Sequence, residues 1–146
     1  MDKLSAFSSK AFNFKGLVAQ NEFPNANHVH DLILNRLENV DASLSEAAFY
    51  HFETPGKMLR AKMAIRSASL AEIDTSISLL WAAAVEVLHN ASLIHDDICD
   101  GDKQRRGRSS IWVKFGQDTA LTLGEWLIAL SFELASEAAE MSNTTR

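Results

Sequence analysis

The chain has 146 residues, with 14 Lys and Arg against 19 Asp and Glu, and a formal net charge of −5. This acidic balance argues against a general nucleic-acid binder, because phosphate contacts need a basic face. A hydrophobic content of 47% and a charged content of 23% exclude disorder over most of the chain. The single cysteine, Cys99, excludes an intrachain disulfide and a zinc site built on cysteines.

Apolar residues recur at intervals of three and four along the chain, and no stretch alternates as a strand would. We expect helices over residues 28–40, 43–52, 57–70, 74–97 and 117–141, with a short element at 111–115. The Asn25–Asn27 run ends the first segment, and Ser43 and Ser45 cap the second helix. The Thr54-Pro55-Gly56 stretch breaks the chain before the third helix. Residues 100–110 are expected to form a charged loop, and the fold class is all-α.

Two regions are predicted, a partly ordered N-terminal segment over residues 1–27 and a helical domain over residues 28–146. No run of 18 uncharged apolar residues is present, so we expect no integral membrane segment. The first 15 residues lack the apolar stretch of a secretory signal. The predicted location is the cytoplasm, with an organelle matrix as the alternative.

A polar stripe is predicted on the long helix that ends near residue 97. His89, Ser92, Asp96 and Asp100 are spaced by three, four and four residues, which places them on one helical face. Farther up this face the side chains are small or apolar. The stripe therefore passes from a hydrocarbon-like surface to a strongly anionic one.

The aspartates at the lower end of this stripe form a candidate metal site. Asp96, Asp97 and Asp100 repel one another at the helix C-terminus, which itself carries partial negative charge. A divalent cation reverses these repulsions, and carboxylate ligands suit Mg²⁺, which commonly shares its coordination with substrate phosphates. The alternative is a solvated acidic helix end.

Two arginines follow the aspartates within the charged loop. Arg105 and Arg106 offer guanidinium forks that bind phosphate in a bidentate manner. A basic surface loop is the alternative for these residues taken alone. Beside an acidic metal site they predict a clamp for a diphosphate.

The motif Asp96-Asp97-Ile98-Cys99-Asp100, followed by Arg105-Arg106-Gly107, resembles the first aspartate-rich motif of the trans-isoprenyl (polyprenyl) diphosphate synthases. His89 and the preceding Ser92–His95 stretch are also similar to this family. Upstream, Pro55–Ala61 resembles the Gly-Gly-Lys-Arg-x-Arg-Pro motif and retains Lys57 and Arg60. Downstream, Phe115-Gly116 and Leu123-Gly124-Glu125 resemble a Phe-Gly and a Gly-Asp stretch, with Glu in place of Asp.

The resemblance implies a helical bundle of the isoprenoid synthase type, of which this chain holds only the N-terminal half. After Asp118 the chain contains no aspartate, so the second aspartate-rich motif of the family is missing. The expected partners are prenyl diphosphates and a second chain. That chain would make a homodimer, or a heteromer with a C-terminal half or a full-length synthase.

The resemblance also assigns roles to the site residues. Asp96, Asp97 and Asp100 would hold Mg²⁺ on an allylic diphosphate that Arg105 also contacts. Lys57, Arg60, His89 and Arg106 would bind the diphosphate of isopentenyl diphosphate. The implied reaction is prenyl transfer: the allylic substrate ionises and is attacked by isopentenyl diphosphate, giving a longer trans-polyprenyl diphosphate.

Chain length in this family often depends on the residues four and five positions before the first aspartate. These are Ser92 and Ala91, both small, which resembles synthases of medium or long products. The next bulky candidate for limiting the chain length is Trp81, about 22 Å above Asp96 along the helix.

Two alternatives to a prenyl transferase stay open. The missing second motif is compatible with a non-catalytic or regulatory subunit of a heteromeric synthase. The aspartates are also compatible with a class I terpene cyclase, although an isopentenyl site at Lys57, Arg60 and His89 argues against cyclisation.

Overall fold

The computed structural model describes residue 16 and residues 23–144, so most of the predicted N-terminal segment (1–27) lies outside the described residues. The helices are α2 (Ala26–Leu37), α3 (Ala42–Phe52), α4 (Leu59–Leu70), α5 (Thr75–Asp100), α6 (Ile111–Phe115) and α7 (Gln117–Thr144). Two short strands, β1 (Gln104–Arg105) and β2 (Arg108–Ser109), pair in antiparallel fashion. The prediction of a helical fold is confirmed. The charged loop predicted at 100–110 is wrong in one respect, since it contains this hairpin.

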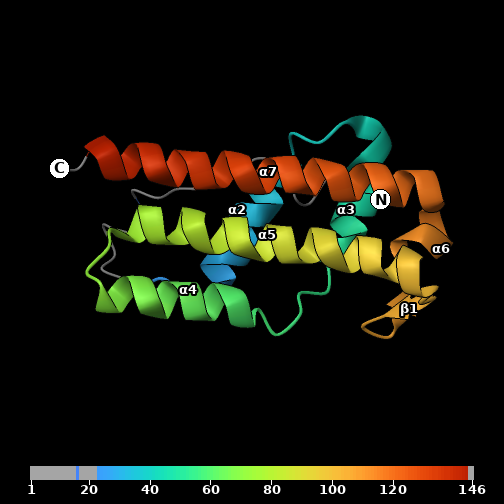
Figure 1. The fold of residues 1–146 in the computed structure, drawn as a ribbon, viewed down its shortest axis with the longest axis horizontal. Coiled ribbons are helices and arrows are strands. Elements are labelled where there is room, and N and C mark those ends of the chain that lie inside the picture. The colour runs from blue at the N-terminus through green and yellow to red at the C-terminus, as the bar shows by residue number, and fades with distance from the viewer. Residues whose placement is uncertain (1–15, 17–22, 145–146) are drawn as a thin grey trace.

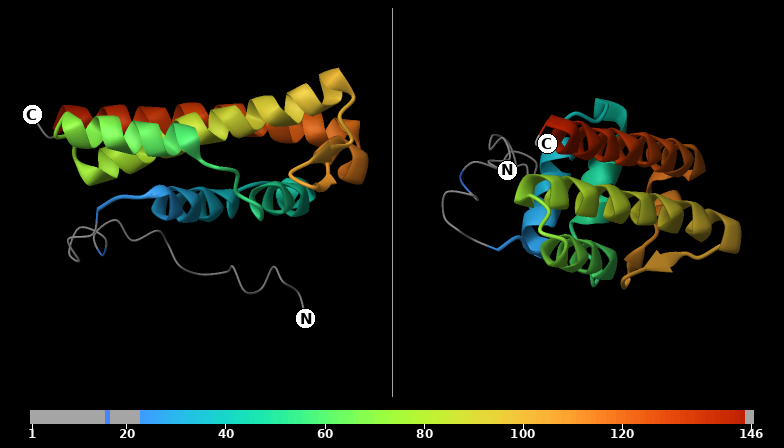
Figure 2. Two further views of the ribbon diagram at one scale, coloured as in Figure 1. Left: turned by 90° about the horizontal axis from the view of Figure 1, so that it is seen from below. Right: turned by 60° about the vertical axis from the view of Figure 1, so that its left-hand side comes forward.

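The helices form two layers. In one layer α4, α5 and α7 lie side by side, with α5 in the middle (Figure 1). Helices α2 and α3 lie against one side of this layer (Figure 2). Among the described residues, no helix covers the opposite side, so one face of α5 is left open.

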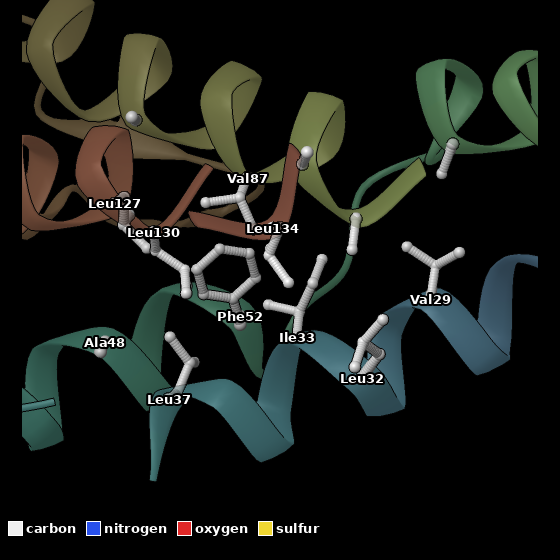
Figure 3. Packing of buried hydrophobic residues seen from close by; sticks show 14 of the residues in the cluster. Val29, Leu32, Ile33, Leu37, Ala48, Phe52, Val87, Leu127, Leu130 and Leu134 are labelled. Atoms are coloured by element: carbon white, nitrogen blue, oxygen red, sulfur yellow. The ribbon is translucent and has the colours of Figure 1, made fainter. Parts of the chain in front are cut away.

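The core lies between the two layers. Ile33 of α2 points toward Val87 of α5 and Leu134 of α7, with Phe52 of α3 beside it, and Val29 and Leu37 extend the same buried cluster along α2 (Figure 3). Fully burying one such side chain stabilises a fold by about 1.5–3 kcal/mol. Helix α5 is long and apolar enough to cross a membrane by composition alone, with a mean hydropathy of 1.5, but 61% of that stretch is buried within the fold. Burial in the core accounts for its apolar composition.

Local capping explains where the helices differ from their predicted bounds. Helix α2 begins two residues early because the Asn25 side chain accepts hydrogen bonds from the backbone of Asn27 and His28. The cap of α3 is Asp41, which accepts from the Ser43 backbone, so the predicted caps Ser43 and Ser45 are wrong.

The ends of α5 matter most for the site. Asp74 caps its start, and the helix continues to Asp100, three residues beyond the predicted end. Gly101 ends it in the left-handed region at φ 72°, which glycine adopts without steric strain. The extension keeps Asp96 and Asp100 one turn apart on the same helix.

Candidate active site

The open face of α5 forms one wall of a groove of about 620 Å³. Its lining residues come from three helices: Arg60 of α4, Val85, Leu88, His89, Ser92, His95 and Asp96 of α5, and Ile128 of α7. Three members of the predicted polar stripe thus meet in one groove, and Asp100 follows on the same helix as an exposed residue. The upper wall is apolar and the lower end is acidic.

Asp97 lies on a different side of α5 from Asp96, because adjacent residues on a helix are about 100° apart. Its side chain is 3% exposed and is held by Arg105. Arg105 Nε donates to both carboxylate oxygens of Asp97, at 3.0 and 2.8 Å, and Nη2 donates at 2.6 Å. Two predicted site residues are therefore joined to each other.

Asp96 and Asp100 keep their carboxylates free. Both are exposed, and neither side chain makes an ion pair or hydrogen bond within the described part of the chain. Within that part, no three His, Cys, Asp or Glu side chains gather to hold a metal ion. A pair of carboxylates nevertheless fits Mg²⁺, which usually takes one or two carboxylates and completes its shell with water and substrate phosphates.

The β1–β2 hairpin sets the direction of the two arginines. Arg106 and Gly107 form its turn with φ values of 52° and 75°, as a two-residue hairpin turn of the primed type requires. Arg105 points to Asp97, whereas Arg106 Nη1 donates to the Thr54 backbone oxygen at 2.6 Å. The sequence Arg-Gly is a weak hairpin signal, so the turn was missed.

Helix α3 anchors this hairpin through Arg108, a residue outside the predicted site. Its guanidinium lies over the Tyr50 ring, 3.8 Å from the centroid, and donates to Thr54 Oγ1 at 3.0 Å. Tyr50 in turn donates to the Ser109 backbone oxygen. The Arg108 side chain is thus held by contacts within the fold, whereas the Asp96 and Asp100 carboxylates are exposed and can bind a ligand.

The predicted diphosphate ligands of α4 are exposed near its start. Lys57 precedes the helix and Arg60 lies in its first turn. Met58 occupies the cap position without a side-chain hydrogen bond, and the buried Glu86 carboxylate of α5 accepts from the Ala61 backbone N–H instead, at 3.1 Å. An acidic residue from a neighbouring helix therefore fixes the start of α4 beside the groove.

His89 is half-buried in the groove, near the guanidinium groups of Arg60 and Arg106. Burial lowers the pKa of His89, and the positive charges of Arg60 and Arg106 lower it further. Burial opposes any charge on the ring, so it is the two guanidinium groups nearby that favour a bound anion. The electrostatics of this end of the groove therefore suit a phosphate group.

The two predicted chain-length residues separate in the structure. Ser92 lies in the groove, whereas Ala91 is fully buried in the core. Trp81 is half exposed farther up α5. Of the pair, Ser92 is the one that borders the open space.

Gly124 of α7, part of the Leu123-Gly124-Glu125 stretch, allows α7 to approach α5 closely. A Cβ atom at this position would overlap the His95 ring. His95 lies across the interface, 3.4 Å from the Leu121 backbone oxygen. The absence of a side chain at Gly124 therefore shapes one edge of the groove.

The acidic end of α5, the two arginines of the hairpin and the apolar groove together form a candidate diphosphate site in a two-layer helical fold. Comparison with known families supports this interpretation. Residues 41–145 match the family described as polyprenyl synthetase, and the chain belongs to this family.

Curated relatives cover several product classes. The chain is 40% identical over 112 residues to a geranylgeranyl diphosphate synthase of Saccharolobus solfataricus, which covers 77% of this chain and 34% of that protein. It is 30% identical to an octaprenyl diphosphate synthase of Haemophilus influenzae, covering 78% of the chain and 35% of that protein. The chain thus spans about a third of the length of these relatives.

Solved structures show the same partial match. A geranyltranstransferase of Thermotoga maritima superposes with a TM-score of 0.73 at 31% identity, covering 80% of this chain and 45% of that one. A geranylgeranyl pyrophosphate synthetase of Geoglobus acetivorans gives 0.70 at 34% identity, covering 75% and 36%. The described helices are therefore part of an isoprenoid synthase fold, as predicted.

Proposed function

We propose that this chain carries a diphosphate-binding part of a trans-prenyl diphosphate synthase, which joins an allylic diphosphate to isopentenyl diphosphate. The observation that carries the proposal is the open groove beside α5, with free carboxylates at one end and cations around His89. Family membership supports the substrate class, and the groove supports the placement of the two diphosphates.

The allylic diphosphate is assigned to the lower end of the groove. Asp96 and Asp100 would hold Mg²⁺ there, and the ion would neutralise the leaving diphosphate. Asp97 has a different part, because its carboxylate fixes Arg105. The remaining Nη1 of Arg105 has no hydrogen bond within the described residues and is left for a phosphate oxygen.

Isopentenyl diphosphate is assigned to the cations around His89. Arg60 lines the groove, Lys57 is exposed just before α4, and Arg106 is close enough to lower the pKa of His89. Several cationic donors suit the charge of a diphosphate. The apolar Val85, Leu88 and Ile128 would shield a reactive allylic cation from water.

The complete reaction is proposed to need further helices, because the chain spans about a third of its relatives. These helices would cover the open face of the α4–α5–α7 layer. They would come from further sequence of the same protein or from a partner chain, in a homodimer or a heteromer.

The test is prenyl transfer by the chain purified from its native host together with whatever chains it binds. We expect Mg²⁺-dependent incorporation of labelled isopentenyl diphosphate into longer prenyl products with farnesyl diphosphate as the starter. Replacing both Asp96 and Asp100 with Asn is expected to lower the rate about 100-fold or more, since charge stabilisation of the leaving group is lost. The matched control is Asp31→Asn, an exposed carboxylate on α2.

The outcome decides between classes of activity. Incorporation that is unaffected by the Asp96 and Asp100 changes would overturn the proposal and favour a non-catalytic subunit. Products formed from farnesyl diphosphate alone, without isopentenyl diphosphate, would overturn it in favour of a cyclase.

A further inference from the structure

A buried polar chain links α3, α5 and the hairpin behind the groove. His51 Nε2 lies 2.9 Å from Asn90 Oδ1, and Arg106 Nη2 donates to the same oxygen at 3.2 Å. Asn90 is 3% exposed and His51 is 8% exposed. Neither residue belongs to the groove lining, and neither was predicted as a site residue.

The orientation of the Asn90 amide follows from its third contact. Asn90 Nδ2 donates to the Glu86 backbone oxygen at 2.8 Å, so the amide oxygen faces His51 and Arg106. Both lone pairs of this oxygen are then used by the two donors. The amide oxygen of Asn90 therefore has a fixed direction, and one of its two donors is Arg106.

His51 reaches Asn90 as a neutral donor. Burial lowers the pKa of His51 to about 4, so near neutral pH the ring carries no charge that would repel Arg106. A neutral histidine carries one N–H, and the Asn90 oxygen is the acceptor that faces Nε2.

The two neighbouring arginines differ in their partners. Arg105 is neutralised by the Asp97 carboxylate, whereas Arg106 has two neutral oxygen acceptors, on Asn90 and Thr54. Neutral acceptors hold a guanidinium in place and leave its net charge available to an anion. Gly56 lies close to the Arg106 guanidinium on another side, because a Cβ at this position would stand 2.9 Å from Arg106 Nη2.

We propose that Asn90 is a positioning residue that holds the Arg106 guanidinium, still fully charged, where it binds a diphosphate beside His89. This inference rests on the proposed function and assigns a role to a residue behind the binding surface. Without Asn90 the Arg106 guanidinium keeps only its hydrogen bond to Thr54, so part of its ordering falls to the ligand, which weakens binding by about threefold to tenfold.

The test is a double-mutant cycle on the full chain, with the affinity for inorganic diphosphate measured by calorimetry in the presence of Mg²⁺. We expect Arg106→Ala to weaken binding about tenfold or more and Asn90→Leu to weaken it about threefold to tenfold. In the Arg106→Ala background the Asn90 change is expected to have no further effect, since Asn90 acts through Arg106.

A second variant perturbs Arg106 from the opposite side and is expected to leave the fold intact. Gly56 is exposed, and an added methyl group meets only the far end of a flexible side chain. Gly56→Ala is therefore expected to displace Arg106 and weaken diphosphate binding, but not in the Arg106→Ala background. Val29→Ala, a core change in α2 remote from the hairpin, controls for loss of stability.

The outcomes separate this inference from the proposed function. If Arg106→Ala weakens binding while Asn90→Leu and Gly56→Ala bind as wild type, the role of Asn90 is overturned and the proposed function stands. Additional weakening by the Asn90 change in the Arg106→Ala background likewise overturns it. If the wild-type chain binds no diphosphate, or Arg106→Ala binds as tightly as wild type, the proposed isopentenyl site fails and the inference fails with it.

Discussion

Asp97 and Arg105 form a bidentate ion pair at the end of α5, with Nη2 2.6 Å from Oδ1, while the adjacent Asp96 leaves its carboxylate free on the open face. Two aspartates that are neighbours in sequence therefore have different environments. One is fixed inside the fold by an arginine, and the other is free to bind a cation.

This difference predicts opposite effects on stability. Asp97→Ala leaves the partly buried Arg105 without its partner and is expected to lower the free energy of unfolding by about 2–3 kcal/mol. Asp96→Ala removes a negative charge from a helix C-terminus and is expected to be neutral or to stabilise by up to about 1 kcal/mol. Urea denaturation of the two variants measures both effects. Equal destabilisation by the two substitutions would contradict the finding that Asp97 is fixed by Arg105 while Asp96 is free.

A second ion pair joins the two helical layers. Both terminal guanidinium nitrogens of Arg36 in α2 donate to the Glu137 carboxylate of α7 at 2.6 Å, across 101 residues of sequence. Because the fork is bidentate and Arg36 is partly buried, Arg36→Ala is expected to cost about 1–2 kcal/mol. Arg66→Ala, at an exposed arginine of α4, is the matched control and should lie within about 0.5 kcal/mol of wild type. An equal loss of stability in both variants would mean that the Arg36–Glu137 ion pair does not stabilise the fold.

The low pKa of His51 predicts a dependence of stability on pH. The folded pKa of about 4 lies below the ordinary value of 6.5, so between these values the unfolded state binds more protons. The contribution is complete above about pH 6.5 and is lost as the pH falls toward 4, by about 3 kcal/mol in total. We expect denaturation curves of wild type and His51→Gln to differ in this pH dependence. Parallel curves for the two proteins would show that His51 is not buried as a neutral ring.

The close contact at Gly124 predicts an unusual response to alanine. Alanine is normally favoured over glycine inside a helix by about 1 kcal/mol. Here the added methyl group would overlap the His95 ring, so Gly124→Ala is expected to destabilise by about 1–3 kcal/mol. Trimming the ring with His95→Ala in the same chain should restore most of the loss. A Gly124→Ala variant more stable than wild type would show that α7 does not approach α5 so closely.

The elements themselves could be predicted from the sequence because each helix carries an apolar stripe with helical spacing. The breaks at Thr54–Gly56 and Gly101 also have local signals. The cap of α3 is Asp41 and not the predicted Ser43 or Ser45, because several polar residues near a helix start compete for that position. The hairpin depends on the contacts of Arg108 with α3, and such contacts between distant segments leave no local pattern.

The site was predictable only in part for a similar reason. Helical spacing alone places His89, Ser92 and Asp96 on one face, and the structure brings them to one groove. The partner of Asp97 is decided by the direction of the hairpin, and spacing within α5 does not encode it. Glu86 and Asn90 carried one available signal, namely polar residues one turn apart on the buried side of an apolar helix.

The most direct test of the account is whether Mg²⁺ couples diphosphate to Asp96 and Asp100. The affinity of the full chain for inorganic diphosphate would be measured with Mg²⁺ and again with a chelator. We predict that Mg²⁺ tightens binding by at least about tenfold in wild type, a difference of roughly 1.4 kcal/mol. We also predict that the combined Asp96→Asn and Asp100→Asn change removes this difference. A Mg²⁺ effect that survives the combined change, or the lack of one in wild type, would contradict the binding of diphosphate through Mg²⁺ at Asp96 and Asp100.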